Sequence, residues 1–167
     1  MGDYLIEVSD ESLGLKTEKP KEFKLREVAK VIVFNQEGKI ALLYIGKDKY
    51  HKLPGGGIEA GENLEDAATR EILEEVGANI ILRDDFLEKT LEYRNKLSLK
   101  QISYCLVADV VGELQETNRT NDEIEIDQRV IWVSVDEAIE RIENDNSDYY
   151  GASFVKAREL AFLKKVN

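Results

Sequence analysis

The sequence predicts an α+β domain built on a mixed β-sheet, and three observations lead to that prediction. Hydrophobic residues make up 43% of the 167 residues and charged residues 34%, so the chain can bury a core. Several short apolar runs have the character of strands, whereas only three segments carry helix signals. Strands and helices do not alternate strictly, which disfavours a doubly wound sheet. We therefore expect one domain over residues 25–167, preceded by an N-terminal extension over residues 1–24.

The first half of the chain is predicted to contain a β-hairpin. Tyr4–Val8 is a candidate strand within the extension. Leu25–Phe34 and Lys39–Ile45 are strand-like runs, and the segment between them, Asn35-Gln-Glu-Gly38, contains the Asn and Gly that hairpin turns favour. Further on, Leu53–Glu62 contains one Pro and four Gly. This composition is typical of a loop, in which neither helix nor strand is comfortable.

The strongest local signals predict a helix over Leu64–Val76. Asn63 is a suitable N-cap, Glu65 and Asp66 favour the first turn, and Gly77 is a C-terminal stop. Later elements are predicted in the same way from apolar runs and caps. They are strands at Ile80–Leu82, about Phe86–Tyr93, Leu97–Val111 and Gln128–Val133, a helix opened by Ser134-Val-Asp-Glu137 and ending near Ile142, and a helix from about Ala152 to Lys164.

The composition excludes several classes of protein. The chain has 34 acidic and 23 basic side chains and a net charge of −11, which disfavours passive binding of nucleic acid because such binding needs Lys and Arg. No apolar run approaches the ~20 residues of a membrane span, and no secretory signal is visible. Cys105 is the single cysteine, and its apolar surroundings indicate a packed core thiol. We expect a cytoplasmic protein with a small-molecule partner, not nucleic acid or membrane.

The predicted helix carries acidic residues in an unusual place. The apolar ridge of this helix consists of Leu64, Ala68, Ile72 and Val76. The glutamates beside the ridge are Glu71, Glu74 and Glu75. Like charges four residues apart cost a few tenths of a kcal/mol, and Arg70 can offset only one of the three. A hard divalent cation such as Mg²⁺ could offset all of them. Because the preceding glycines allow close backbone approach, the pattern indicates a metal-assisted polyphosphate site; the alternative is a solvated acidic face.

The spacing of these residues resembles a known signature. From Gly56 the chain reads Gly-x5-Glu62-x7-Arg70-Glu71-Ile72-x-Glu74-Glu75-x-Gly77-Ala78, which is similar to the 23-residue signature of the Nudix, or MutT-like, hydrolases over residues 56–78. The departure is Ala78, where the family usually has a larger aliphatic residue. The resemblance implies an α/β/α sandwich with a mixed central β-sheet. It also implies Mg²⁺- or Mn²⁺-dependent cleavage of a diphosphate linkage in a nucleoside diphosphate derivative.

The resemblance also implies roles for individual residues. The Gly55 carbonyl, Glu71, Glu74 and Glu75 would be metal ligands, Glu71 or Glu75 the base, Arg70 the residue that orients the glutamates, Glu62 the tie between loop and helix, Gly77 the helix stop, and Gly56, Gly57 and Lys52 contacts to substrate. A further ligand often comes from a later loop, here Gly112–Asp127, where Glu123 and Glu125 are candidates and a solvated acidic loop is the alternative. We select Glu123. His51, just before the glycines, either contacts phosphate or is incidental.

The substrate is less well determined by the signature. A nucleoside triphosphate pyrophosphohydrolase is our first choice, with an ADP-ribose or dinucleoside polyphosphate hydrolase behind it. Tyr93 stands where some ADP-ribose-cleaving relatives have Pro, which disfavours that subgroup. A non-catalytic nucleotide sensor is disfavoured because all three signature glutamates are present, and an isopentenyl diphosphate isomerase because Cys105 lies mid-strand. Dimers are common in the family, so a homodimer is a candidate assembly.

Overall fold

The computed structural model describes residues 3–117 and 119–167, and for residues 84–87 it describes the backbone only. The described strands form one eight-stranded sheet. The strands are β1 (Glu7–Ser9), β2 (Lys24–Phe34), β3 (Ile40–Ile45), β4 (Tyr50–Lys52), β5 (Gly55–Gly57), β6 (Asn79–Arg94), β7 (Leu99–Val111) and β8 (Gln128–Val133). The helices are α1 (Leu64–Val76), the 3₁₀ turn η1 (Asn95–Leu97), α2 (Asn121–Glu125), α3 (Val135–Glu143) and α4 (Ala152–Val166).

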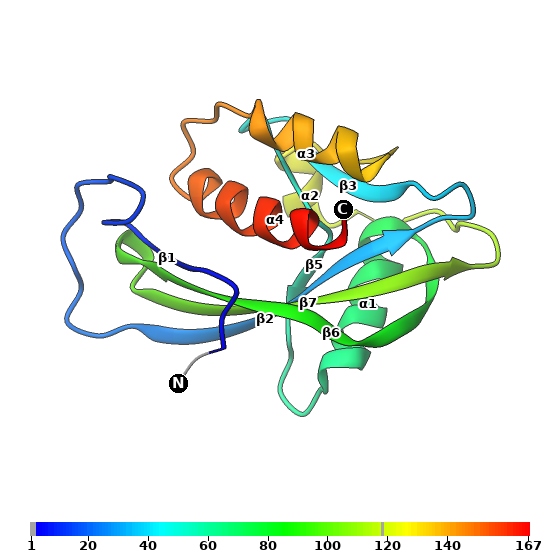
Figure 1. Ribbon diagram of the computed structural model, residues 1–167, viewed down its shortest axis with the longest axis horizontal. Coiled ribbons are helices and arrows are strands. Elements are labelled where there is room, and N and C mark those ends of the chain that lie inside the picture. Colours follow the sequence, from blue (N-terminus) through cyan, green and yellow to red (C-terminus); the bar gives the residue numbers. More distant parts are fainter. Residues whose placement is uncertain (1–2, 118) are drawn as a thin grey trace.

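Helices cover both faces of the sheet (Figure 1). On one face α1 buries its apolar ridge, with Ile72 and Val76 in a cluster that includes Val31 and Leu106. On the other face α3 and α4 pack in a second cluster that includes Phe162. The sheet is mixed, because β1 runs parallel to β6 and β2 parallel to β7 while the other pairs are antiparallel. The predicted α+β sandwich with a mixed central sheet is therefore confirmed.

The predicted hairpin forms only at its tip. The turn is present, since Asn35 N donates to Lys39 O at 2.8 Å, but β2 and β3 share the single pair Phe34–Ile40. Beyond that pair, β5 lies along β2 in antiparallel register. The strands therefore separate, and β3 pairs with β4 and β8 instead.

The glycine segment was wrongly predicted to be free of strand structure. Gly55–Gly57 forms β5, and Gly55 has φ +139°, a conformation that L residues rarely adopt. A Cβ atom at Gly55 would fall 2.8 Å from the Lys30 Cα. Only glycine can therefore approach β2 this closely, and a composition that indicates a loop instead makes a short strand.

The remaining boundaries follow the predictions with local differences. The two strands predicted over Ile80–Tyr93 are one strand, β6, interrupted by register shifts against β7. β7 begins at Leu99 rather than Leu97, because η1 and Ser98, with φ 49°, form the connection. The prediction missed β4 and the short helix α2. The predicted helix α1 is confirmed: Asn63 Oδ1 accepts from Asp66 N at 2.8 Å, and Gly77 ends the helix with φ 74°.

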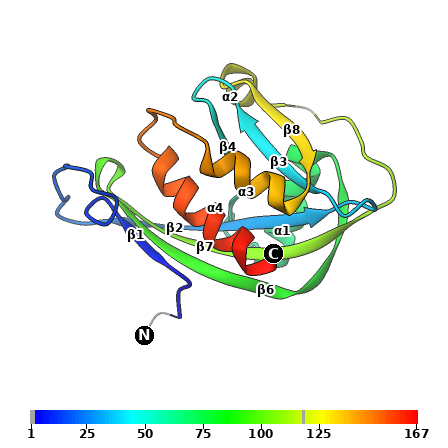
Figure 2. The same ribbon diagram turned by 45° about the horizontal axis from the view of Figure 1, so that its top comes forward.

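The N-terminal segment joins the sheet at the end remote from α1 (Figure 2). Its strand β1 overlaps the candidate Tyr4–Val8 and pairs with the last residues of β6. Cys105 is fully buried, as expected for a core thiol. Among the described residues, the helices are all too short or too polar to cross a membrane.

Candidate active site

The glycine strand lies directly against the carboxylate of Glu71. A Cβ atom at Gly56 would fall 2.6 Å from the Glu71 carboxylate carbon, whereas a Cβ at Gly57 would meet the Arg26 guanidinium at an ordinary 3.6 Å. The Glu71 side chain is 14% exposed. Burial raises its pKa above the ordinary value, although Arg70 opposes the shift. The fold therefore places a partly desolvated carboxylate against half-buried glycine backbone.

Arg70 connects the glycine strand with the helix carboxylates. Its Nε and Nη2 donate to the two oxygens of Glu62 at 2.8 and 2.9 Å, and Nη2 also donates to Gly57 O at 3.1 Å. Its Nη1 donates to Glu71 Oε1 at 2.9 Å and lies 3.4 Å from Glu74 Oε2. The hydrogen bonds from Arg70 lower the pKa of Glu62 to about 2. Arg70 thus contacts Glu62, the glycine strand and two glutamates of α1, and the positioning roles of Arg70 and Glu62 stay predictions.

Glu75 and Glu123 meet at one amide group. Glu75 Oε1 accepts from Gly55 N at 2.7 Å and Oε2 from Gln128 Nε2 at 3.3 Å. The same Gln128 Nε2 donates to Glu123 Oε2 at 2.8 Å. Glu123 is fixed in turn by the capping box of α2, in which Thr120 N donates to its Oε1 at 3.1 Å. The structure therefore brings Glu123 to the glutamates of α1, whereas Glu125 is exposed.

The donor set fits a hard divalent cation in its chemistry. Among the side chains that the structure describes, in residues 3–83, 88–117 and 119–167, no three His, Cys, Asp or Glu are gathered as a ready metal cluster. Arg70 holds Glu71, Gly55 N and Gln128 hold Glu75, and the Glu74 side chain is 58% exposed. Burial raises the pKa of Glu75, against the attraction of Lys52 and Lys30. Carboxylate oxygens beside close glycine backbone are the ligands that Mg²⁺ and Mn²⁺ prefer.

A cationic cavity adjoins the same glycines. It has a volume of about 180 Å³. Its charged lining comes from four parts of the fold: Arg26 and Lys30 of β2, Lys52 of β4, Arg94 of β6 and Arg158 of α4. One wall is aromatic, because the rings of Tyr50 and Tyr149 stack with centroids 5.7 Å apart and planes 10° apart. We call this the cationic pocket.

Two buried carboxylates hold three of the cations in the pocket. Glu159 pairs with Arg158 at 2.8 Å and with Lys30 at 3.6 Å. Glu92 pairs with Arg158 at 3.0 Å and with Arg94 at 2.6 Å. Burial lowers the pKa of Lys30 to about 8, and burial together with Arg94 and Arg158 lowers the pKa of Arg26. The positive charge therefore exceeds the negative charge in this network.

The sequence reasoning missed most of the cationic pocket. Lys52 was predicted, but Arg26, Lys30, Arg94, Arg158 and Tyr149 were not. Two signals were present in the sequence: Lys30 interrupts an apolar strand, and the pair Arg158-Glu159 interrupts an apolar helix face. Such charges are rarely buried without partners.

His51, for which the sequence left open a phosphate contact or an incidental role, pairs with an acidic residue. The side chain is buried, and its Nδ1 lies 2.8 Å from Asp145 Oδ1 while its backbone N donates to Asp145 Oδ2 at 2.7 Å. Asp145, in the segment after α3, thus binds both the ring and the backbone nitrogen of His51. His51 therefore has a structural partner in Asp145.

The fold is an α/β/α domain in which glutamates of α1 lie against glycine backbone. A family model described as NUDIX domain matches residues 24–152. The chain belongs to the NUDIX family, so the resemblance seen in the signature is confirmed. Hydrolases of this family generally use divalent metal ions.

Individual relatives agree with this assignment. The chain is 45% identical over 60 residues to an RNA pyrophosphohydrolase of Wolbachia sp. subsp. Brugia malayi, covering 34% of this chain and 35% of that protein. It is 34% identical over 111 residues to the mitochondrial Nudix hydrolase 13 of Arabidopsis thaliana, covering 62% and 54%. The chain thus spans about a third to a half of these relatives. The fold resembles that of a NUDIX hydrolase from Nitrosomonas europaea, with a TM-score of 0.59, 18% identity and coverage of 81% and 89%.

Proposed function

We propose that this protein is a Mg²⁺- or Mn²⁺-dependent hydrolase that cleaves a diphosphate linkage in a nucleoside diphosphate derivative, with a nucleoside triphosphate as its first-choice substrate. The observation that carries the proposal is the seating of Glu71 on Gly56 and of Glu75 on Gly55 N. Both carboxylates are partly desolvated and next to backbone that a phosphate chain can approach. A cytoplasmic enzyme acting on a small nucleotide is part of the same proposal.

The chain's own residues account for the steps of hydrolysis. The oxygen of water forms a bond to phosphorus, the bridging P–O bond breaks, and the leaving phosphate takes the electron pair. The water loses a proton to a carboxylate, and burial raises the pKa of Glu71 and of Glu75, which makes each a stronger proton acceptor than an exposed glutamate. Arg70 holds Glu71 in place through the bond at 2.9 Å. The Gly55 carbonyl, Glu71, Glu74, Glu75 and Glu123 would hold the divalent cation, which supplies neutralisation of the phosphate charge.

A panel of nucleotides tests this function. Nucleoside triphosphates, ADP-ribose and dinucleoside polyphosphates are incubated with the protein and Mg²⁺, and the products are identified by chromatography. We expect a nucleoside monophosphate and pyrophosphate from the triphosphates, and no product when EDTA replaces Mg²⁺. Formation of no product from any substrate would support the non-catalytic sensor instead.

A pair of matched variants tests the role of Glu75. Glu75→Gln removes the charge while keeping the size, and kcat should fall by at least about 100-fold because a proton acceptor and metal ligand is lost. Glu65→Gln makes the same change at an exposed position in the first turn of α1 and should leave kcat unchanged. Undiminished turnover by Glu75→Gln would refute the proposed role.

A further inference from the structure

The cationic pocket contains more positive charge than its own carboxylates can neutralise. Lys30, Arg94 and Arg158 share Glu92 and Glu159, and all five side chains are at least nine-tenths buried. Uncompensated charge in a buried network is costly. A chain with a net charge of −11 has nevertheless concentrated cations at this one place. An anion from outside would complete the network.

Two further cations at the pocket are available to such an anion. Across the described ranges, neither Arg26 nor Lys52 forms an ion pair, and the one side-chain bond recorded for Arg26 is to the neutral Gln101 Oε1 at 3.5 Å. Arg26 lies over Gly57, and Lys52 acts electrostatically on Glu75. Both residues therefore line the cationic pocket, Arg26 beside the glycine strand and Lys52 within electrostatic reach of Glu75 of α1.

We infer that the cationic pocket is a phosphate subsite, in which Arg26 and Lys52 bind a phosphate group of the substrate other than the one under attack. This inference rests on the proposed function and specifies its substrate class: a nucleotide with a phosphate-rich end, such as a triphosphate, is selected over a diphosphate joined to an uncharged sugar. Guanidinium and ammonium groups bind phosphate by charge-assisted hydrogen bonds, and Arg can do so with two parallel bonds. A neutral nucleoside would leave the excess charge uncompensated.

The aromatic wall of the cationic pocket consists of Tyr50 and Tyr149. Burial and the neighbouring Tyr149 raise the pKa of Tyr50 to about 12, so its ring is neutral at physiological pH. Tyr50 therefore does not repel an anion. Its outer member, Tyr149, is 46% exposed and offers a flat apolar surface to the rest of the substrate.

Direct binding of inorganic tripolyphosphate tests the subsite without turnover. Calorimetry in EDTA should detect binding to the wild-type protein, with affinity that falls as salt is added. Arg26→Gln and Lys52→Gln should each weaken binding about tenfold, because one charge-assisted bond is lost. Lys39→Gln, at an exposed Lys in the turn before β3, should not. Failure of tripolyphosphate to bind, or equal binding by all four proteins, would overturn the inference.

Steady-state kinetics separate this inference from the proposed function. Arg26→Gln should raise KM for a nucleoside triphosphate about tenfold and leave KM for ADP-ribose within about twofold. Equal increases in KM for both substrates would show that the pocket does not distinguish substrates by their number of phosphate groups. That result would overturn the inference and leave the proposed function unaffected. Retained tripolyphosphate binding with no hydrolysis of any nucleotide would overturn the proposed function and leave the subsite standing.

Discussion

At Gly56 a missing side chain determines where the carboxylate of Glu71 lies. The backbone there does not require glycine for its conformation, since Gly56 does not have a positive φ. Its constraint is the Glu71 carboxylate carbon, 2.6 Å from where a Cβ would stand. The neighbouring Gly57 has no such contact. Both residues are glycines of β5, but an added Cβ atom would collide with the Glu71 carboxylate only at Gly56. They therefore form a matched pair for testing.

Gly56→Ala is expected to lower activity with little effect on stability. The added methyl group must displace the Glu71 carboxylate, which is the flexible end of a side chain, so the free energy of unfolding should change by no more than ~1 kcal/mol. The displaced carboxylate should lower kcat/KM by at least about tenfold, since small errors in position are costly in catalysis. Gly57→Ala adds the same methyl group at an ordinary distance from Arg26 and leaves the Glu71 carboxylate in place, so it should lower kcat/KM less than Gly56→Ala does. Equal activities of the two variants would refute the importance of this contact.

The end of α1 fixes the loop that leads toward Glu123. Gly77 ends the helix in the left-handed conformation, and its carbonyl accepts from Gln115 N at 2.7 Å. A Cβ at Gly77 would collide with the Gln115 carbonyl, whose carbon lies 3.1 Å away. Gly61 has a similar φ of +79° with open space around it. These two glycines separate the cost of backbone conformation from the cost of a steric clash.

Substitution by alanine should therefore destabilise the two positions unequally. Gly61→Ala should cost ~1 kcal/mol, the penalty of a left-handed L residue alone. Gly77→Ala should cost ~3 kcal/mol, because the clash with Gln115 adds to that penalty. Urea unfolding of both variants measures the difference. Losses of equal size would mean that the loop moves aside freely.

The elements predicted well are those whose signals are local. The helix over Leu64–Val76 has its cap at Asn63 and its stop at Gly77 within its own sequence, and both work as expected. The hairpin was predicted too long because β5, and not β3, pairs with β2 beyond the Phe34–Ile40 pair. The approach of β5 to β2 depends on the Gly55 conformation. No short window of sequence contains that three-way packing of β2, β3 and β5.

In the candidate site, too, residues with local signals were predicted and residues brought together from distant segments were not. The glutamates and Arg70 share one helix and were predicted from spacing, whereas the cationic pocket draws Arg26, Arg94 and Arg158 from elements far apart in the chain. Arg26 and Arg94 are unremarkable within their own segments, and the charged pair Arg158-Glu159 in an apolar helix face does not indicate that the other two arginines lie nearby. Their convergence is a property of the sheet order and of where α4 crosses it, so local patterns could not predict it.

At the scale of the whole molecule, the N-terminal segment supports the cationic pocket through hydrogen bonds to residues next to it. This segment precedes residues 24–152, which the family model matches. Asp10 is fully buried. Its carboxylate accepts from Asn95 N and from the Tyr150 hydroxyl, both at 2.9 Å, and from Thr17 Oγ1 at 2.7 Å. Asn95 and Tyr150 directly follow the pocket residues Arg94 and Tyr149. One carboxylate thus connects the N-terminal segment with two walls of the pocket.

Asp10→Ala should affect substrate binding more than the chemical step. Three donors lose their acceptor, so the free energy of unfolding should fall by roughly 2–4 kcal/mol. The loosened walls should raise KM for a nucleoside triphosphate several-fold, while kcat stays within about twofold because α1 and the glycine strand are untouched.

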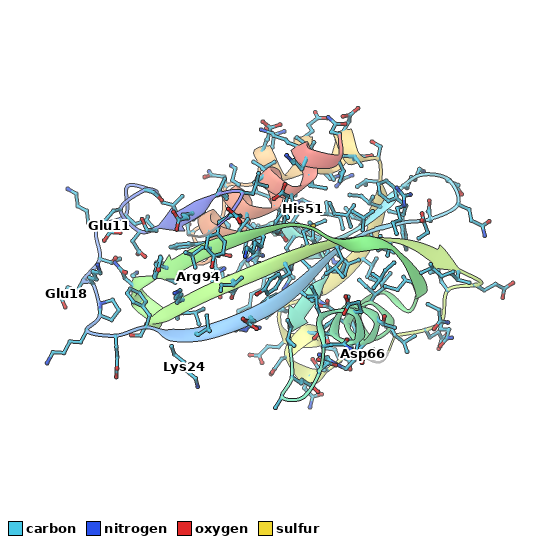
Figure 3. All side chains as sticks on the ribbon, turned by 60° about the horizontal axis from the view of Figure 1, so that its bottom comes forward. Glu11, Glu18, Lys24, His51, Asp66 and Arg94 are labelled. Atoms are coloured by element: carbon cyan, nitrogen blue, oxygen red, sulfur yellow. The ribbon has the colours of Figure 1, made fainter. Side chains whose placement is uncertain are left out.

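Two further variants decide whether Asp10 acts on the pocket through position. Glu18→Ala changes an exposed acid of the same segment, which lies on its outer side (Figure 3), and should alter neither KM nor stability. Asp10→Asn keeps one acceptor oxygen and should restore part of both losses. Steady-state kinetics and urea unfolding are measured on the same preparations. A loss of stability with an unchanged KM would mean that the N-terminal segment supports the fold alone, because a brace for the pocket must influence how tightly the pocket holds its ligand.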